Sequence, residues 1–326
     1  MRPELLSELR SSDVKWILRT ARLLASDVER AASIVKTPAY TELCHVGKEQ
    51  APELSSVAPD ALRAQLEEML LLDGVPLGLQ WLYDSGALLA LLPELHATVN
   101  FSQEAGRRHK DVWEHTKQVV WQSPPRPVVR WSALLHDIGK VKTRAFTPDG
   151  KVTFHRHSEV GARMFDDIGR RFQFDRDNHR SLRFLILHHL RPNAYLPSWT
   201  DSAVRRFAKE IGPYLPDLLD LSRADITSRK PGRRQQGLGN IDTLSQRVSQ
   251  IRAEDAVIPP LPSGIGDAIM DKFRMPPSKL IGDLKRELLA KIDAGEIEPR
   301  MESEYYLPIV EQMIASRAEA PRLCCE

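Results

Sequence analysis

The chain has 326 residues, of which 42% are hydrophobic and 28% are charged, as is typical of a soluble globular protein. Its net charge of +2 excludes a globally basic surface, so any contact with RNA would have to come from local patches. No apolar run approaches the roughly 18–20 residues that a membrane-spanning helix needs, and the start of the chain lacks the apolar core of a signal peptide.

Apolar residues recur at intervals of three and four through most of the chain, which predicts amphipathic helices. One interruption is residues 146–155, where Asp149-Gly150 separates two short alternating runs and predicts a β-hairpin. Another is the polar, glycine-rich and basic segment 229–240, which we predict to be a loop. The predicted helices span residues 4–35, 59–70, 76–95, 111–121, 126–136, 158–172, 178–190, 201–211, 215–228, 241–257, 266–273, 278–295 and 302–320. The predicted fold class is therefore all-α: a helical bundle with one small β-hairpin, flanked by helical N- and C-terminal segments.

Histidines are concentrated in the middle of the chain, where eight of the ten fall between His109 and His189. Several of them, with two aspartates, lie in or at the edge of separate predicted helices. Imidazole nitrogens and carboxylate oxygens suit divalent Mn, Fe, Co, Ni and Zn, whereas Mg prefers the oxygens. The candidate metal ligands, in chain order, are His115, His136, Asp137, His157, His188, His189 and Asp225.

Each of these residues also has an ordinary interpretation. A single histidine in an amphipathic helix, such as His115, is usually packed or on the surface. His188 and His189 point about 100° apart on a helix, so the pair alone indicates little. Asp225 alone would be typical of a capping or salt-bridged carboxylate. The order of the whole set, at intervals of roughly 20 to 40 residues, favours a site for one or two divalent ions, with Asp137 able to bridge two of them.

The phrases DVWEHT, ALLHDIGK, FHRHSEVGA, LILHHLRP and RADITS resemble the HD-domain superfamily of metal-dependent phosphohydrolases. The resemblance implies that the seven candidates above are the metal ligands, with His188 and His189 matching the HH pair of members that hold two metals. It also implies that Lys140 of HDIGK faces the substrate phosphate. Gly139, beside it, is expected to end the preceding helix in a left-handed conformation.

A wider resemblance covers roughly residues 50–315, which are similar to the helical body and C-terminal region of bacterial CCA-adding tRNA nucleotidyltransferases and poly(A) polymerases. Those enzymes polymerise with a head that carries a Gly-Ser motif followed by a D-x-D carboxylate pair. Neither motif is found in this sequence, so nucleotidyl transfer is not expected. The resemblance implies three segments: a neck- or body-like segment (1–97), an HD domain (98–230) and a C-terminal helical segment (231–326).

Basic residues near the candidate ligands suggest how a phosphate substrate would be bound. His155 lies two residues before His157 on the predicted hairpin strand, so both would project on the same face. Solvated residues or structural salt bridges are the ordinary interpretation of all of these groups. The predicted substrate-binding residues are Lys140, His155, Arg156, Arg223, Arg229 and Arg233, with a second basic cluster at 107–110.

The leading functional hypothesis is a phosphohydrolase in which Asp137 and Lys140 are catalytic and a metal-activated water attacks phosphorus. Its substrates would be phosphomonoesters or 2′,3′-cyclic phosphodiesters of nucleotides or RNA ends, those of tRNA included. Two alternatives remain: a non-catalytic RNA-binding module and a di-iron oxygenase of the same fold. Because none of the three cysteines lies in a CxxC pair, a reducing cytoplasm fits best.

Overall fold

The computed structural model describes residues 13–102, 111–228, 230–257 and 259–319. The described residues form two compact units. The first is built from Met1–Ala194 and Pro213–Ile241, and the second from Tyr195–Gly212 and Asp242–Glu326. The predicted division at residues 97 and 230 stays a prediction.

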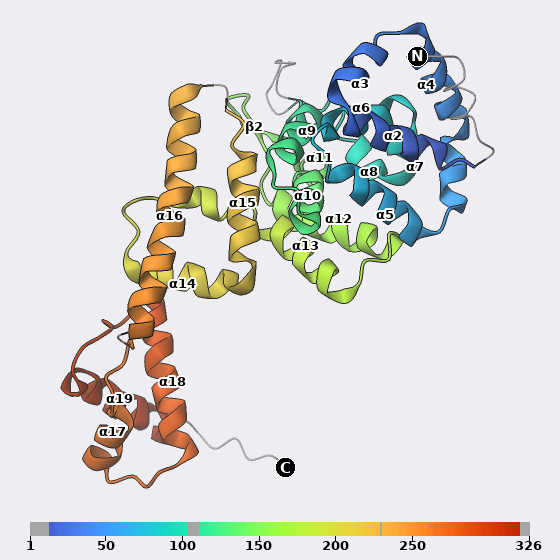
Figure 1. Cartoon of the computed structure of the whole chain (residues 1–326). Helices are drawn as coiled ribbons and strands as arrows, with labels where there is room; N and C mark the ends of the chain where they lie inside the picture. Colours follow the sequence, from blue (N-terminus) through green and yellow to red (C-terminus); the bar gives the residue numbers. More distant parts are fainter. Residues whose placement is uncertain (1–12, 103–110, 229, 258, 320–326) are drawn as a thin grey trace. The chain divides into compact units, whose positions relative to one another are not determined.

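The first unit is a bundle of helices with one hairpin (Figure 1). Its elements are α2 (Trp16–Ser26), α3 (Val28–Ile34), α4 (Pro38–Gln50), η1 (Ala51–Ser56), α5 (Pro59–Leu70), α6 (Val75–Asp84), α7 (Ala87–Leu91), α8 (Pro93–His96), α9 (Val112–Gln122), α10 (Pro127–Leu135), α11 (Lys140–Thr143), β1 (Ala145–Phe146), β2 (Val152–Thr153), α12 (His157–Arg171), α13 (Arg176–His188), η2 (Pro192–Ala194) and α15 (Leu215–Asp225). The strands pair antiparallel, with Ala145 opposite Thr153 and Phe146 opposite Val152. The all-α prediction with a single hairpin is confirmed for the described residues.

The second unit contains α14 (Asp201–Ile211), α17 (Ile265–Phe273), α18 (Lys279–Ala294) and α19 (Ser303–Glu319). Two elements, η3 (Gly212–Tyr214) and α16 (Pro231–Val257), contain residues of both units. The core of the second unit gathers apolar side chains of α17, α18 and α19, among them Ile269, Leu284 and Tyr306, each with none of its surface exposed. No described helix has the length and apolar character that crossing a bilayer would require.

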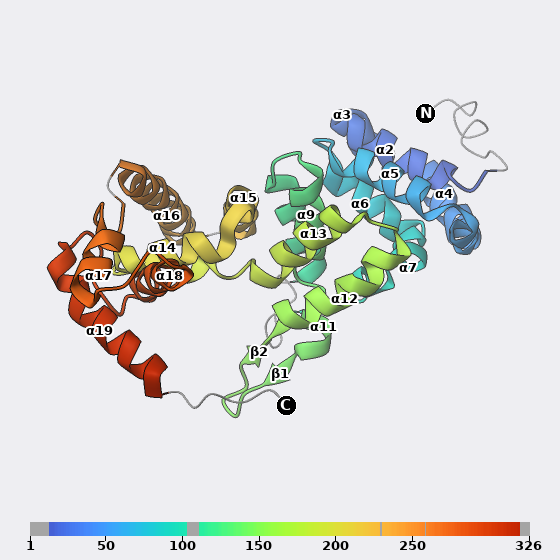
Figure 2. The ribbon, with the colours of Figure 1, turned by 90° about the horizontal axis from the view of Figure 1, so that it is seen from below.

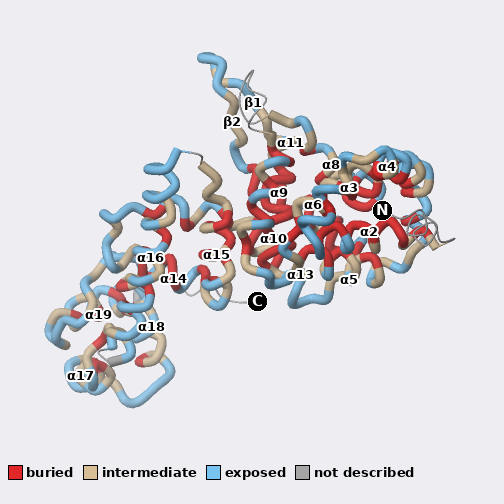
Figure 3. Tube along the Cα trace, turned by 45° about the horizontal axis from the view of Figure 1, so that its top comes forward, coloured by how far each residue is buried: buried red, intermediate tan, exposed pale blue. Residues whose placement is uncertain are grey.

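Helix α10 is the centre of the first unit. Pro127 starts it, where a missing N–H costs nothing, and every residue from Val129 to Leu135 is buried. It packs against α5, α9, α13 and α15, and Figure 3 shows buried trace where these helices meet. Because neighbouring helices surround α10 on several sides, its last residues lie in the interior of the bundle.

Three of the details that differ from the predictions concern where helices begin and end. The helical pattern over 4–35, as far as it is described, is split at Asp27, whose side chain caps α3 by accepting a hydrogen bond from the N–H of Arg30. The predicted loop 229–240 is wrong, because α16 begins at Pro231. Glycine allows close packing there: a Cβ on Gly237 would lie 3.1 Å from the Ile226 side chain. Gly139 is not left-handed either, since its φ is −67°.

Candidate metal centre

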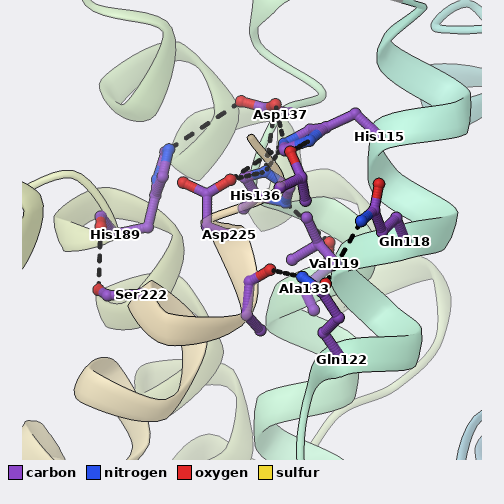
Figure 4. Close-up of polar contacts among 12 residues, drawn as sticks. His115, Gln118, Val119, Gln122, Ala133, His136, Asp137, His189, Ser222 and Asp225 are labelled. Atoms are coloured by element: carbon purple, nitrogen blue, oxygen red, sulfur yellow. Dashed lines mark hydrogen bonds and ion pairs between the residues drawn. The ribbon is translucent and has the colours of Figure 1, made fainter. Parts of the chain in front are cut away.

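Six of the seven candidate ligands come together at the ends and inner faces of five helices in the first unit. His115 lies in α9, and Asp225 is the last residue of α15. The other four lie where a helix begins or ends: His136 and Asp137 after α10, His157 at the start of α12, and His189 just after α13. Figure 4 shows the side chains of His115, His136, Asp137, His189 and Asp225 turned toward one another.

The six side chains form two groups with the spacing of metal sites, and the first consists of His115, His136 and Asp225. Its two Nε2 atoms are 3.3 Å apart. Asp225 Oδ1 lies 3.0 Å from Nε2 of His115 and 3.6 Å from Nε2 of His136. A single ion could therefore contact all three residues.

The second group consists of Asp137, His157 and His189. The Nε2 atoms of the two histidines are 3.3 Å apart, and Asp137 Oδ1 lies 3.5 Å and 4.0 Å from them. The other oxygen of Asp137 faces the first group, 3.1 Å from Nε2 of His136. Asp137 thus presents one oxygen to each group, which is the arrangement that a carboxylate bridging two ions requires.

Hydrogen bonds to the backbone fix the orientation of three of the rings. Nδ1 of His136, His157 and His189 lies 2.8, 2.8 and 2.7 Å from the carbonyl oxygen of the residue three positions earlier. A carbonyl only accepts, so Nδ1 of each ring carries a proton and donates it to the backbone, and each ring turns its Nε2 inward. Hydrogen bonds from the outer ring nitrogen to a backbone carbonyl are typical of histidines that ligate metals.

The donor set fits a cation. The 3.3 Å contact between Nε2 of His157 and Nε2 of His189 joins two lone pairs when both rings are neutral, so it cannot be a hydrogen bond. Asp137 is 2% exposed, and among the described residues its buried Oδ1 has no hydrogen-bond partner. A divalent ion would satisfy these atoms together, and four imidazoles with two carboxylates suit a transition metal better than Mg.

Two histidines of the centre have pKa values that are shifted in opposite directions. Burial lowers the pKa of His136, but the adjacent carboxylates of Asp137 and Asp225 outweigh burial and raise this pKa to about 10. Burial and the charge of His136 lower the pKa of His189 to about 4. Burial also opposes ionisation of the two aspartates, yet the neighbouring cationic groups hold both of their pKa values well below the usual range. The carboxylates are therefore ionised and ready to bind a cation.

Lys140 is the first residue of α11 and reaches back to the centre. Its Nζ donates to Asp137 Oδ2 at 2.6 Å, and the side chain is only 12% exposed. The ammonium also lies 5.6 Å from the centre of the Phe154 ring. This placement puts a positive charge beside the carboxylate that connects the two groups.

The structure leaves His188 and His155 outside both groups. His188 is one helical step from His189 and packs instead against the Phe184 ring, with centroids 4.3 Å apart. The prediction that His155 and His157 share a strand face is wrong: β2 ends at Thr153, His155 lies exposed in a turn, and His157 begins α12. Of the HH pair, His189 is the member that lies in one of the two donor groups, and its role as a metal ligand stays a prediction.

The predicted phosphate-binding arginines are on or near the surface. Arg156 is exposed and lies 3.7 Å from Glu159, while Arg223 forms a 3.0 Å ion pair with Asp220. Arg233 is exposed in the first turn of α16. Arg229 and the basic cluster at 107–110 lie outside the described residues. Arg156 and Arg223 thus show the ordinary surface interactions considered above, and the role of all these arginines in binding stays a prediction.

Three polar residues that contact the candidate ligands or the backbone beside them were missed in the sequence. Thr227 Oγ1 lies 3.0 Å from Nδ1 of His115. Gln122 donates to the carbonyl of Ala224 at 2.6 Å, and Ser222 donates to the carbonyl of His189 at 3.3 Å (Figure 4). Gln122 follows His115 by two helical turns and so lies on the same face of α9, which is the one signal that could have identified it.

Comparison with known proteins finds a matching domain family and several similar proteins. The HD domain family matches residues 98–230, a range that contains all six clustered ligands. The A-adding tRNA nucleotidyltransferase of Deinococcus radiodurans is 30% identical over 266 residues, covering 79% of this chain and 60% of that protein. The CC-adding tRNA nucleotidyltransferase of Thermus thermophilus is 29% identical over 261 residues, covering 77% and 56%.

A shorter match is the multifunctional CCA protein of Pseudomonas fluorescens, 31% identical over 172 residues, with 51% of this chain and 40% of that protein covered. The chain thus spans about 60% or less of the length of these relatives. The predicted resemblance is confirmed: residues 98–230 match the HD domain family, within a chain that is similar to tRNA nucleotidyltransferases.

Proposed function

We propose that this protein is a metal-dependent phosphohydrolase that acts on phosphomonoesters or 2′,3′-cyclic phosphodiesters of nucleotides or RNA ends. The observation that carries the proposal is the position of Asp137, which gives one buried carboxylate oxygen to each of two groups of metal-type donors. A pair of divalent ions held in this way can activate a water and neutralise the charge of a phosphoryl group.

The ions would be held by His115, His136 and Asp225 on one side and by His157 and His189 on the other, with Asp137 between them. Lys140 would compensate negative charge on a phosphate oxygen, because its ammonium already lies 2.6 Å from Asp137 Oδ2 and therefore at the edge of the centre. The carbonyl bonds to Nδ1 keep the imidazoles in one orientation, so little reorganisation is needed when substrate arrives.

The substrate class follows from the relatives. Two of them are named for adding nucleotides to tRNA, so we propose that the end of an RNA, including tRNA, reaches the centre of this chain as a substrate or partner. The HD domain supports hydrolysis of phosphate esters rather than nucleotide addition. A cytoplasmic location stays a prediction from the cysteine pattern.

Two other functions would use the same residues differently. A non-catalytic RNA-binding module has no need for six convergent metal donors, and it would bind RNA in a salt-dependent way without releasing phosphate. A di-iron oxygenase would contain iron and consume oxygen. The charge of Lys140 at the edge of the centre favours an anionic substrate and so the phosphohydrolase.

The test combines metal analysis of the purified protein with a screen of linear and 2′,3′-cyclic nucleotides for phosphate ester hydrolysis. His136→Ala and Asp137→Ala should both lose bound metal and lower turnover of the best substrate by at least about 100-fold. His45→Ala is the matched control, because His45 is exposed in α4 and pairs with Glu49 at the surface.

These two variants test whether the metal centre is the active site. If Asp137→Ala keeps its metal and hydrolyses the best substrate at the wild-type rate, the centre described above is not the active site. If the wild-type protein binds metal and consumes oxygen, but hydrolyses no phosphate ester, the oxygenase alternative replaces the proposal.

A further inference from the structure

A guanidinium at the start of the hairpin that follows Lys140 lies close to two aromatic rings, one on the hairpin and one in the segment before α9. The carbon at the centre of the Arg144 guanidinium is 5.1 Å from the centroid of the Phe101 ring and 5.1 Å from that of Phe146. We call these three residues the hairpin platform. Phe101 also approaches Phe154, with centroids 6.3 Å apart, so the platform is continuous with the ring that faces Lys140.

The platform has an open aromatic face. Phe146 is 62% exposed, the largest exposed fraction among the large apolar side chains of the described residues. It lies at the end of β1, and Figure 3 shows the hairpin extending away from the helices of the first unit with exposed trace toward its turn. An exposed phenylalanine held against a guanidinium offers a flat surface to a second ring.

The positive charge of the platform also favours an anionic ligand. Among the described residues no carboxylate pairs with Arg144, which is held by the two rings instead. Lys142, two residues earlier in α11, is exposed. Aromatic faces beside uncompensated cations are the combination that binds single nucleotides and unpaired strands, because bases stack while the cations attract phosphate.

The platform is close to the metal centre along the chain. Helix α11 places one turn between Lys140 and Arg144, and β1 adds two extended residues to Phe146. The Cα atoms of Lys140 and Phe146 are therefore no more than about 13 Å apart along this path. Figure 2 shows the hairpin continuing directly from α11 beside α12, the helix that His157 begins.

From these observations we infer that the hairpin platform binds the base of the substrate, with Phe146 stacking on it while the phosphate lies at the metal centre. The centre would then prefer phosphate esters that carry a base, such as an RNA end, over simple sugar phosphates. The inference rests on the proposed function in one respect, namely that the metal centre is the phosphate site.

The experiment compares adenosine 5′-monophosphate with ribose 5-phosphate, which lacks the base, as ligands of the metal-loaded full chain in calorimetric titrations. Release of inorganic phosphate is followed in parallel, and where a ligand is turned over its kcat/KM replaces the affinity. Phe146→Ala should weaken the nucleotide about tenfold and change the sugar phosphate less than about twofold. Phe146→Trp should keep the preference for the nucleotide.

Leu89→Ala is the matched control, since Leu89 is 54% exposed in α7 and lies outside the platform. It should leave both ligands unchanged, and the metal content of all variants should equal that of the wild type. Because Phe146 is mainly exposed, its replacement should leave the fold intact.

The outcomes separate the two proposals. A preference for the nucleotide that Phe146→Ala abolishes supports the inference, even if no phosphate is released, in which case only the proposed hydrolysis fails. Equal affinity for both ligands, or a preference that survives in Phe146→Ala, overturns the inference while leaving hydrolysis intact. If the metal-loaded wild type binds neither ligand, the metal centre is not a phosphate site and both proposals fall.

Discussion

Gly139 and His157 approach so closely that no side chain fits between them. A Cβ built on Gly139 would lie 2.0 Å from the carbonyl oxygen of His157 and 2.6 Å from the backbone nitrogen of Gly161. Both atoms belong to the backbone of α12, so neither can rotate away. The glycine therefore lets the segment that carries His136 and Asp137 rest against the start of α12, where His157 lies.

Replacing this glycine should damage the metal centre as well as the fold. Gly139→Ala should lower the free energy of unfolding by about 3 kcal/mol, because backbone must move to admit the methyl group, and should reduce the bound metal. Urea unfolding and metal analysis measure the two effects. Gly239→Ala is the control: nothing lies within 4 Å of its Cβ position in α16, so it should be neutral or stabilise by up to about 1 kcal/mol. A Gly139→Ala variant with wild-type stability and metal content would contradict the packing argument.

The two adjacent histidines after α13 should behave differently. His189 is 1% exposed, with its Nε2 in the second group of donors, whereas His188 packs on Phe184. We expect His189→Ala to lower metal affinity by about 10- to 100-fold or more and His188→Ala to keep the wild-type metal content. Metal titration of each variant after chelation tests this difference, and equal losses would show that both rings serve the metal.

Metal affinity should increase with pH. In the metal-free protein the pKa of His136 is raised to about 10, because Asp137 and Asp225 outweigh the effect of burial. A ligand must give up this proton, so binding one ion should release about one proton from His136 near neutral pH, and the apparent affinity should rise roughly tenfold per pH unit between about pH 6 and 8. His189, with a pKa of about 4, is already neutral there.

Calorimetric titration of the metal-free protein in buffers of different ionisation enthalpy counts the protons released. A pH-independent affinity would mean that His136 does not bind the ion. The same raised pKa makes protonated His136 a stabilising group of the metal-free fold below the unfolded-state pKa of about 6.5. That stabilisation is lost as the pH rises through about 10.

An ion-pair network in the second unit should set part of its acid stability. Asp255 accepts from Arg205 at 2.7 and 3.0 Å and from Arg300 at 2.7 Å. Burial raises the pKa of Asp255, but the two guanidinium groups outweigh it and lower the pKa below its usual range. The folded-state pKa is depressed, so this stabilisation is present above the unfolded pKa of about 3.9 and is lost as the pH falls through the lower folded value.

Asp255→Asn should therefore destabilise the protein at neutral pH by about 2 kcal/mol, because Arg205 is 8% exposed and would lose its charged partner. The difference from the wild type should shrink below about pH 4. Glu302→Gln, at an exposed position, is the control and should unfold like the wild type. A constant difference in stability down to about pH 3 would argue against the network.

The grouping of the candidate ligands was predictable from the sequence because five of the six lie at helix ends, where residue type and helical period both leave a signal. His136 and Asp137 follow a run that packs as α10, and Asp225 ends α15. Which member of the HH pair turns inward depends on how α13 is rotated against its neighbours, and periodicity could not decide this for His188 and His189.

Other features depend on contacts between distant segments. Glycine-rich composition predicted a loop at 229–240, but the structure starts α16 at Pro231, with Gly237 packed against Ile226. The hairpin platform was missed because Phe101 lies more than 40 positions before Arg144, and only the fold brings the two together. The alternating pattern also could not show where the second strand of the hairpin ends. The prediction therefore placed His155 on a strand, whereas it lies in a turn.

The position of Asp225 at the end of α15 has a consequence for folding. An ion shared by His115, His136 and Asp225 would cross-link parts of the chain about 110 residues apart, much as a disulfide does when it closes a long loop. Such a closure removes conformational freedom from the unfolded chain and is worth on the order of several kcal/mol in stability. Metal supply would then determine how long this chain survives unfolding and proteolysis, independently of any reaction that it catalyses.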